Sequence, residues 1–224
     1  ITINKVLNEF KKEDRATIAM ACGSGKTLVS FWIAELLKPK FTVVFLPSKA
    51  LLKQIREEWL SQEFKNGLLE NISIFSEKEY SEYDEQNIGI ADTTFRVVNS
   101  KENIKKFLSQ KSNNTKVVFC TYQSSPLLSR SLPSGFSFDY GVFDEAHKTT
   151  SNKILKDKSN QKFSWNMPLQ NNFIKIKKRL FMTATLKTSN YIKQNKLGYE
   201  QIVYSMTNEK QYGKIVDNFT FVKA

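Results

Sequence analysis

Two short polar motifs in the chain have the residue types and the spacing that nucleotide hydrolysis requires. The first reads Met-Ala-Cys-Gly-Ser-Gly-Lys-Thr at residues 20–27, and it joins an apolar run to a helix-forming stretch. Such a strand–turn–helix unit can hold phosphates, because backbone N–H groups at the start of a helix point at the anion. The second reads Asp-Glu-Ala-His at residues 144–147, and it follows another apolar run, as a strand that delivers a metal-binding acid would. In this order, the two motifs predict ATP and Mg²⁺ as ligands.

The residues of the first motif have separate expected roles in phosphate binding. Gly23 and Gly25 let the backbone approach the phosphates without a Cβ clash, and Ser24 lies between them. Lys26 places a positive charge near the β- and γ-phosphates, and the Thr27 hydroxyl is suited to ligate Mg²⁺. The motif departs from the generic phosphate loop at its first position, where this chain has a methionine in place of glycine.

The second motif combines two acids with the only histidine of the chain. Asp144 is expected to hold Mg²⁺, and Glu145 is expected to accept a proton from the attacking water. His147 is expected to sense the γ-phosphate, although an ordinary structural histidine is an open alternative. Thr183 and Thr185 follow a later apolar run in the same way. Their hydroxyls are candidates to hydrogen-bond with His147 or Glu145 and so to relay the state of the site.

Apolar runs and helix-forming stretches alternate along the chain, which predicts an α/β fold. The expected strands are 16–20, 41–46, 72–75, 117–120, 140–143 and 179–182, and the expected helices are 4–12, 26–38, 47–59 and 101–109. The strands are almost continuously apolar, which is typical of a parallel sheet covered by helices on both faces. The acidic and aromatic stretch 76–96 is expected to be an irregular surface excursion.

Length and composition limit the class of protein. A chain of 224 residues suits one large α/β domain that spans residues 1–224. No apolar run approaches the ~18 residues that a membrane-spanning helix needs. The polar N-terminus begins without Met, which suggests a fragment of a longer protein. Cys22 and Cys120 offer neither a disulfide framework nor metal-binding spacing, so a cytoplasmic protein without a membrane partner is expected.

The net charge of +12 is unevenly distributed along the chain. Residues 146–199 contain twelve Lys and Arg but one acid, Asp157, whereas residues 57–85 are rich in acids. A basic surface of this kind suits a polyanion, because Lys and Arg contacts to phosphates dominate nucleic-acid affinity. An alternative stays open: the lysines reflect the base composition of the genome and cover an ordinary solvated surface.

With these motifs, the chain resembles superfamily 2 helicases and translocases, specifically their first RecA-like domain. Residues 20–27 resemble motif I, residues 144–147 resemble motif II of the DEAH type, and residues 183–185 resemble motif III. Residues 47–54, Pro-Ser-Lys-Ala-Leu-Leu-Lys-Gln, are similar to motif Ia, and residues 121–124 match a further strand-end element. The resemblance implies a RecA-like P-loop NTPase fold and ATP hydrolysis that is coupled to movement along a nucleic acid.

A narrower resemblance is to the helicase domains of restriction–modification enzymes, above all the single-polypeptide restriction translocases. It rests on runs such as Cys-Thr-Tyr-Gln-Ser, Arg-Leu-Phe-Met-Thr-Ala-Thr and, at residues 204–209, Tyr-Ser-Met-Thr-Asn-Glu. It implies double-stranded DNA as the partner, with nuclease, methyltransferase or specificity segments in the same or a partner chain. A second RecA-like domain with its arginine finger is expected outside residues 1–224, so these residues alone are expected to be weakly active.

The resemblance also implies where the motifs lie on the sheet. The strand at 179–182 is expected between the phosphate-loop strand and the motif II strand, next to the nucleotide. Both candidate nucleic-acid segments follow strands of the same sheet and should emerge at one edge. Four residues in them are expected to contact the phosphate backbone without reading bases: Ser48, Gln54, Thr121 and Gln123. A simple helix cap at Ser48 and a core position for the neighbouring Tyr122 are the alternatives.

Two other functions remain open at this level. A DExH RNA helicase domain would carry the same motifs, because contacts to the phosphate backbone do not distinguish DNA from RNA, whereas contacts to the 2′-OH do. A DNA-binding module whose ATP site acts as a switch, without translocation, would carry them too. Stimulation of ATP hydrolysis by different nucleic acids separates these possibilities.

Overall fold

The computed structural model describes residues 1–62, 68–75, 97–150, 154–156, 162–188, 191–194, 200–203 and 205–219. For residues 154–156, 162–163, 191–194 and 200–203, the description is limited to the backbone. The stretch 76–96, which the sequence predicts to be a surface excursion, lies outside the described residues. So do many side chains of the basic segment 146–199.

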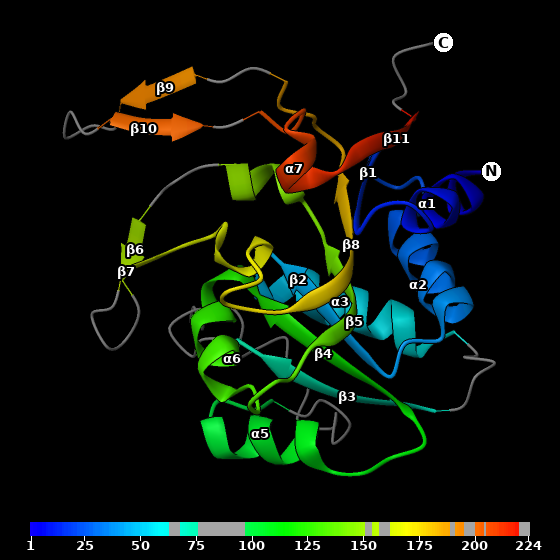
Figure 1. Ribbon diagram of the computed structural model, residues 1–224, viewed down its shortest axis with the longest axis vertical. Coiled ribbons are helices and arrows are strands. Elements are labelled where there is room, and N and C mark those ends of the chain that lie inside the picture. The colour runs from blue at the N-terminus through cyan, green and yellow to red at the C-terminus, as the bar shows by residue number, and fades with distance from the viewer. Residues whose placement is uncertain are drawn as a thin grey trace.

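A seven-stranded parallel sheet forms the centre of the fold (Figure 1). Its strands are β1 (Arg15–Met20), β2 (Phe41–Leu46), β3 (Leu69–Ile74), β4 (Thr115–Thr121), β5 (Phe138–Phe143), β8 (Ile176–Thr183) and β11 (Lys214–Phe219). They are arranged in the order β11-β1-β8-β5-β2-β4-β3, and every neighbouring pair is parallel. The predicted parallel α/β, RecA-like fold is therefore confirmed. The central position of β8, between β1 and β5, is confirmed as well.

Burial explains why the strands form where they do. All seven residues of β4 are buried, and five of the six residues in each of β1, β2 and β5 are buried too. Strands that are apolar on both faces are buried only in a sheet that is covered by helices on each side. The edge strand β11 differs, because its residues are exposed or intermediate, and the apolar pattern did not predict it.

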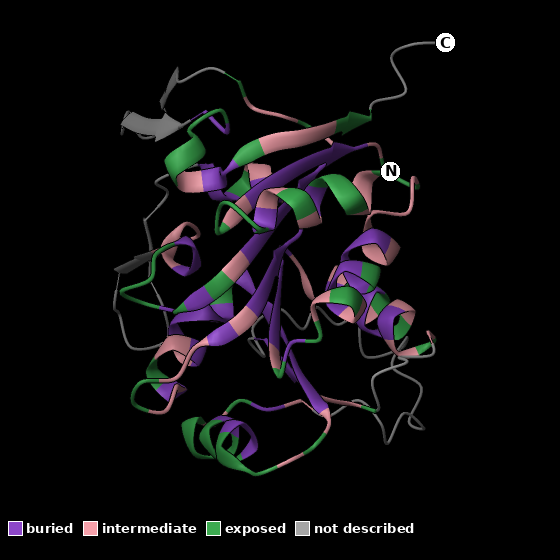
Figure 2. Cartoon of the chain, turned by 45° about the vertical axis from the view of Figure 1, so that its right-hand side comes forward, coloured by how far each residue is buried: buried purple, intermediate pink, exposed green. Residues whose placement is uncertain are grey.

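Helices cover both faces of the sheet, as expected (Figure 2). One face carries α1 (Thr2–Phe10), α2 (Lys26–Leu37) and α3 (Lys49–Leu60). The other carries α5 (Lys101–Ser109) and α6 (Ser125–Ser131). Each layer buries its own apolar cluster: Phe31 and Trp59 pack edge to face in the first, and Phe107 and Leu128 belong to the second. The first turn of α2 and the end of β1 thus lie on a rigid base.

Shorter elements connect the main layers. They are the 3-10 helices η2 (Tyr122–Ser124), η3 (Ala146–Thr150) and η4 (Met167–Leu169), the helix α7 (Glu209–Tyr212), and two antiparallel pairs, β6 (Ile154–Lys156) with β7 (Lys162–Ser164) and β9 (Tyr191–Gln194) with β10 (Glu200–Val203). The sequence pattern predicted none of these elements, and α6 was also missed. Among the described helices, none combines the length and apolar character needed to cross a bilayer.

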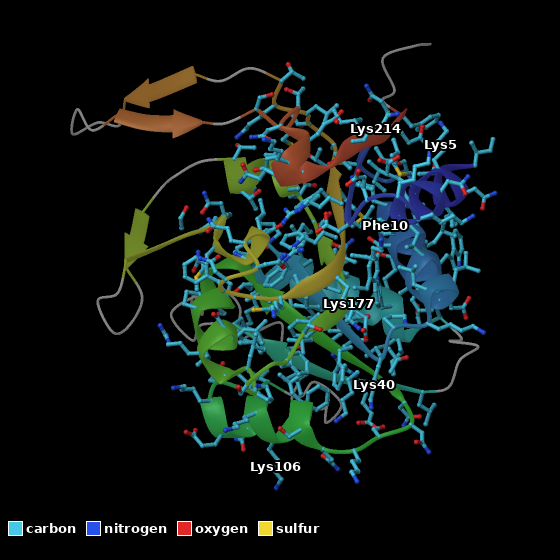
Figure 3. The ribbon with its side chains drawn as sticks, viewed as in Figure 1. Lys5, Phe10, Lys40, Lys106, Lys177 and Lys214 are labelled. Carbon is cyan, nitrogen blue, oxygen red and sulfur yellow. The ribbon has the colours of Figure 1, made fainter. Side chains whose placement is uncertain are left out.

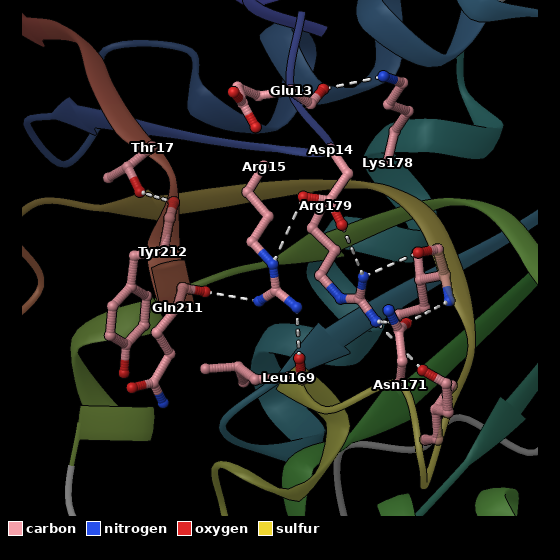
Figure 4. Close-up of polar contacts among 12 residues, drawn as sticks. Glu13, Asp14, Arg15, Thr17, Leu169, Asn171, Lys178, Arg179, Gln211 and Tyr212 are labelled. Carbon is pink, nitrogen blue, oxygen red and sulfur yellow. Dashed lines mark hydrogen bonds and ion pairs between the residues drawn. The ribbon is translucent and has the colours of Figure 1, made fainter. Parts of the chain in front are cut away.

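The guanidinium groups of two arginines, at the start of β1 and within β8, lie near the amino ends of these strands and join segments that are distant in sequence (Figure 4). Arg15 donates to the carbonyls of Gln211 at 2.6 Å and Leu169 at 2.9 Å. Arg179 is fully buried, and it donates to the Ile176 carbonyl at 2.7 Å and to the side chain of Asn171 at 2.6 Å. These bonds fix the chain that leads into β8 and the chain that leads into β11. The amino edge of the sheet is therefore a structural junction.

Candidate active site

The phosphate loop joins β1 to α2 with a backbone that only glycine adopts readily. Gly23 has a φ of 74° and Gly25 a φ of 84°, and Gly25 is the N-cap of α2. A Cβ built at either glycine would meet no atom within 4 Å, so the space next to both is open. The Ser24 hydroxyl closes the turn by donating to the Ala21 carbonyl at 2.6 Å. An open, glycine-lined loop at a helix N-terminus fits a phosphate group.

The two residues that begin α2 lie next to this open space. The Lys26 ammonium group donates to the carbonyls of Met20, the last residue of β1, at 3.1 Å and of Ala21, the first of the loop, at 3.2 Å. Thr27 is partly exposed on the first turn of the helix. The N–H groups of a first turn have no partner within the helix, so this end of α2 can donate to a ligand. Lys26 and Thr27 are thus placed to meet a phosphate and its cation.

The two acids of motif II follow β5 at the same edge of the sheet. Asp144 is 5% exposed, and its backbone N–H donates to the Phe45 carbonyl at 3.0 Å. Burial raises the pKa of the Asp144 carboxyl to about 6, and the charge of Glu145 adds to the rise, while Lys26 and His147 oppose it. A buried carboxyl in this state fits a divalent cation, which favours the ionised form.

His147 connects motif II to the strand end that follows β8. Its Nδ1 lies 2.9 Å from the Thr183 hydroxyl and 3.2 Å from a carboxylate oxygen of Glu145. The sequence predicted a hydrogen bond from this strand end to His147 or Glu145, and the structure has it at His147. The contact with His147 lowers the pKa of Glu145, although burial acts in the opposite direction. Thr185 is exposed, and it reaches Thr183 through its backbone N–H at 3.0 Å.

Sheet order brings these motifs together. β1, β8 and β5 are adjacent, and their register pairs Ala19 with Thr183 and Phe143 with Phe181. The loop after β1, the loop after β5 and the strand end after β8 therefore emerge side by side at the carboxyl edge. Across the described residues, no group of three or more His, Cys, Asp or Glu side chains could hold a metal by itself. A Mg²⁺ ion would instead need Thr27, Asp144 and the phosphates of a nucleotide.

The four candidate nucleic-acid residues are placed in two different ways. Gln54 on α3 and Gln123 in η2 are exposed. The Ser48 hydroxyl caps α3 by accepting from the Leu51 N–H at 3.3 Å, and Thr121 is buried with its hydroxyl donating to Ser124 at 3.1 Å. The strands that precede Ser48 and Thr121 are neighbours, so both segments do emerge at one edge. Of the four, the two glutamines are exposed, Ser48 is half-buried and Thr121 is buried.

Two buried tyrosines next to motif II were not among the predicted site residues. The Tyr122 hydroxyl donates to the Asp144 carbonyl at 2.8 Å, and the Tyr212 hydroxyl lies 3.1 Å from that of Thr149. Tyr122 also fills the core, as the alternative interpretation held. Its place directly after a strand of the same sheet was a signal that could have indicated its role. No comparable signal marked Tyr212.

Exposed lysines are distributed over many elements (Figure 3). Those labelled in the figure come from α1, the start of β2, α5, β8 and β11: Lys5, Lys40, Lys106, Lys177 and Lys214. They lie from one end of the molecule to the other, and Lys5 and Lys177 form ion pairs with Asp217 and Asp139. These five side chains do not form one basic face.

Comparison with known proteins identifies the family. A family model described as "Type III restriction enzyme, res subunit" matches residues 1–188. The chain belongs to this family. A comparison with curated proteins finds no match.

Two solved structures are similar to this member of the res-subunit family over almost its whole length. The ATP-dependent Type ISP restriction-modification enzyme LlaBIII, bound to DNA, has 28% identity and a TM-score of 0.71 over 97% of this chain. A nuclease-deletion mutant of the Type ISP enzyme LlaGI, in complex with a DNA substrate mimic, has 27% identity and a TM-score of 0.71 over 98% of it. This chain spans 14% of the first protein and 19% of the second.

Proposed function

We propose that residues 1–224 form a single RecA-like motor domain of an ATP-dependent DNA translocase that belongs to a cytoplasmic restriction–modification enzyme. One observation carries the proposal. Lys26, Glu145 and His147 converge at the carboxyl edge of adjacent strands in a member of the res-subunit family. Ligands of open α/β sheets bind at this edge.

The residues of the site divide the work of ATP hydrolysis. The glycine loop and Lys26 hold the triphosphate, and Thr27 and Asp144 would hold Mg²⁺, which neutralises phosphate charge when it is bound. Glu145 accepts a proton from the attacking water, since its lowered pKa keeps the carboxylate ionised at neutral pH. His147 orients that carboxylate and links it to Thr183.

Duplex DNA is the proposed partner, because both similar restriction enzymes were solved with DNA or a DNA mimic. Gln54 on α3 and Gln123 in η2 are exposed and can donate to phosphate oxygens. Contacts of that kind fix position without reading sequence, which suits an enzyme that steps along any DNA. Nuclease, methyltransferase and specificity segments, together with a second RecA-like domain, are the further partners that we propose.

An arginine from another domain completes the proposed site. Of the arginines that the structure describes, Arg15 and Arg179 lie at the amino edge, Arg56 is buried against Asn71, and Arg130 lies on α6. None of these four is placed at the phosphate loop. A trans-acting arginine accelerates related phosphoryl transfer by about 10³–10⁵. Residues 1–224 alone should therefore hydrolyse ATP far more slowly than the full-length protein does, and vigorous DNA-stimulated turnover by these residues would contradict the proposal.

The nature of the partner is tested by ATP hydrolysis in the full-length protein with duplex DNA, single-stranded DNA or RNA. We expect duplex DNA to give the largest stimulation. Gln54→Ala and Gln123→Ala should weaken DNA binding about equally for unrelated sequences, and ATP binding should be retained. Stimulation by RNA alone would indicate an RNA helicase, and binding without any stimulation would indicate a switch module. Loss of affinity for a single DNA sequence would contradict backbone tracking.

A further inference from the structure

A row of packed aromatic rings runs beside the motif II loop, residues 144–150. The ring pairs are Trp165 and Tyr122 at 5.6 Å, Tyr122 and Phe45 at 6.0 Å, Phe45 and Phe143 at 5.0 Å, Phe143 and Phe181 at 4.8 Å, and Phe181 and Tyr212 at 5.2 Å. The rings of each pair are stacked except in the last, Phe181 and Tyr212, which is edge to face. The row crosses β2, β5 and β8 near their carboxyl ends. A tyrosine near each end bonds to the motif II loop. Tightly packed rings of this kind transmit displacement, because an interior packed to high density cannot deform freely.

Tyr122 holds the backbone of motif II directly. Its hydroxyl donates to the Asp144 carbonyl at 2.8 Å, and the side chain is completely buried. Burial raises the pKa of Tyr122 well above its ordinary value, with smaller contributions from Asp144, Tyr212 and Glu145, so the phenol stays a donor. A buried carbonyl that lost this donor would be costly to leave unpaired.

The held carbonyl belongs to the peptide group that sets the backbone angle of Glu145. The φ of Glu145 is 47°, in the left-handed region that residues other than glycine adopt at a cost. Rotation of the Asp144–Glu145 peptide changes that φ, and with it the direction in which the Glu145 carboxylate points. By holding the Asp144 carbonyl, the Tyr122 hydroxyl therefore fixes the orientation of Glu145, the proposed proton acceptor.

The same short segment presents a candidate nucleic-acid contact to solvent. Gln123, the next residue, is exposed, whereas Thr121 and Ser124 are tied to each other and Ser125 donates to the Tyr122 carbonyl at 2.8 Å. A ligand that moves Gln123 must move this hydrogen-bonded turn and the Tyr122 ring within it. Two consecutive residues of this segment therefore face opposite ways: Gln123 is exposed to solvent, and Tyr122 bonds to motif II in the interior.

We propose that Tyr122 is a positioning residue that couples nucleic-acid contact at residues 121–124 to the orientation of Glu145. The inference rests on the proposed function and deepens it. It assigns the proposed stimulation of ATP hydrolysis by DNA to the hydrogen bond from Tyr122 to the Asp144 carbonyl, which joins the segments that follow β4 and β5. It predicts that DNA raises kcat through Tyr122 with little change in the KM for ATP.

The test compares Tyr122→Phe with Tyr140→Phe in the full-length protein. Tyr140 is a matched control, because it is also fully buried and its hydroxyl also donates to a backbone carbonyl, that of Ser30 at 3.4 Å. With duplex DNA, Tyr122→Phe should lower kcat about three- to tenfold, the usual effect of one such hydrogen bond, and change the KM for ATP less than about twofold. Tyr140→Phe should leave kcat and its stimulation by DNA unchanged. Equal stimulation in wild type and Tyr122→Phe, or an equal loss in both variants, would overturn the proposal.

A double-mutant cycle with Gln123→Ala isolates the coupling. If Tyr122 transmits the contact, the loss of DNA stimulation in the double variant should be smaller than the product of the two single losses. Multiplicative losses would overturn the coupling. Hydrogen exchange in the wild-type protein gives a second measurement that does not depend on how the variants fold. The amides of residues 144–146 should exchange more slowly with duplex DNA, and unchanged exchange would also overturn it.

Glu145→Gln, measured in parallel, separates this inference from the proposed function. Full turnover in Glu145→Gln would refute Glu145 as the proton acceptor, and the inference with it, because the proposed coupling acts on that carboxylate. Loss of turnover in Glu145→Gln, together with normal DNA stimulation in Tyr122→Phe, would refute the role of Tyr122 and leave the proposed function intact.

Discussion

The amino ends and the carboxyl ends of the same three strands use charged residues differently: those at the amino ends hold the fold together, and those at the carboxyl ends face a proposed ligand site. At the amino edge of β1, β5 and β8, arginines donate short hydrogen bonds to backbone carbonyls, and Arg179 is completely buried (Figure 4). At the carboxyl edge, Lys26 makes longer bonds of 3.1 and 3.2 Å to the carbonyls of Met20 and Ala21, next to open space. Phosphate oxygens can compete with the carbonyls that bind Lys26, whereas the arginines make bonds that hold the fold.

The acids of the two edges differ in the same sense. Asp14 at the amino edge is half exposed and lies 3.7 Å from Arg15 and 3.9 Å from Arg179. Asp144 at the carboxyl edge is almost buried, and burial raises its pKa to about 6. The comparison indicates that this sheet uses charged groups for stability at one end and keeps them available for ligands at the other. Variants at the two edges should therefore separate activity from stability.

The largest expected effect is on catalysis at the carboxyl edge. Glu145→Gln in the full-length protein should lower kcat by about 10²–10⁴, because the proton acceptor is lost, while ATP binding is retained. Steady-state hydrolysis and nucleotide binding measure the two quantities. Asp14→Asn is the matched acid at the amino edge, and its kcat should equal that of the wild type. Equal kcat in Glu145→Gln and wild type would show that the two edges do not divide the work in this way.

The largest expected effect on stability lies at the amino edge. Arg179→Met removes the charged donor to Ile176 and Asn171, leaves buried acceptors unpaired, and should lower the free energy of unfolding by about 2–4 kcal/mol. Denaturant unfolding checks this value. Lys177→Met, two positions earlier on the same strand, loses an exposed ion pair with Asp139 and should cost less than about 1 kcal/mol. A similar loss in both variants would mean that the arginine network does not hold the junction.

A glycine near the amino edge gives a smaller effect. Gly213 has a φ of 69°, and a Cβ there would lie 2.3 Å from the Arg15 carbonyl oxygen. Gly213→Ala should therefore lower the free energy of unfolding by about 1–3 kcal/mol through clash and backbone strain. Gly135→Ala is the matched control, because Gly135 has a φ of 71° but open space around its Cβ position. The difference between the two unfolding energies measures the clash alone, and no difference would contradict the close approach of β11 to β1.

The smallest effect is a pH dependence of the contact between α1 and β11. Asp217 accepts from Thr2 at 2.5 Å and from Lys5 at 2.8 Å. Burial raises its pKa, but these hydrogen bonds outweigh burial, so the pKa is lower in the folded state. The stabilisation is then complete above the ordinary aspartate pKa of about 4 and is lost as the pH falls through the folded value.

Urea titrations at several pH values detect this effect. The wild type should be more stable than Asp217→Asn by up to about 1 kcal/mol at neutral pH, and the difference should disappear in acid. A difference that persisted unchanged at low pH would indicate that the ionised carboxylate contributes nothing to the contact.

The sequence predicted the parts of the molecule where strong local signals agree. The continuous apolar runs located the central strands, and glycine spacing located the phosphate loop and the start of α2 at Lys26. The resemblance gave the position of β8, which the periodicity alone could not. The hydroxyls after the last of these apolar runs were candidate partners for His147 or Glu145, and the structure has Thr183 bonded to His147.

The parts that sequence reasoning missed depend on distant contacts. β11 has no buried residue within it, and it is held by backbone pairing with β1 and by the bond from Thr17 to the Tyr212 carbonyl at 2.7 Å. Whether the hydroxyls of Ser48 and Thr121 face solvent or bond within their own segments depends on local turns that the pattern does not specify. From its residue type alone, a tyrosine next to a strand is expected to fill the core. Only the fold reveals that the Tyr122 hydroxyl bonds to motif II.

Movement along duplex DNA is tested most directly by displacement of a third DNA strand from a triplex. The full-length wild-type protein, supplied with ATP and Mg²⁺, should displace the third strand, because a translocating motor removes an obstacle on its track. Glu145→Gln should bind the same DNA and ATP but leave the third strand in place. Displacement by Glu145→Gln at the wild-type rate, or no displacement by an ATP-hydrolysing wild type, would contradict a translocase driven from the carboxyl edge of the sheet.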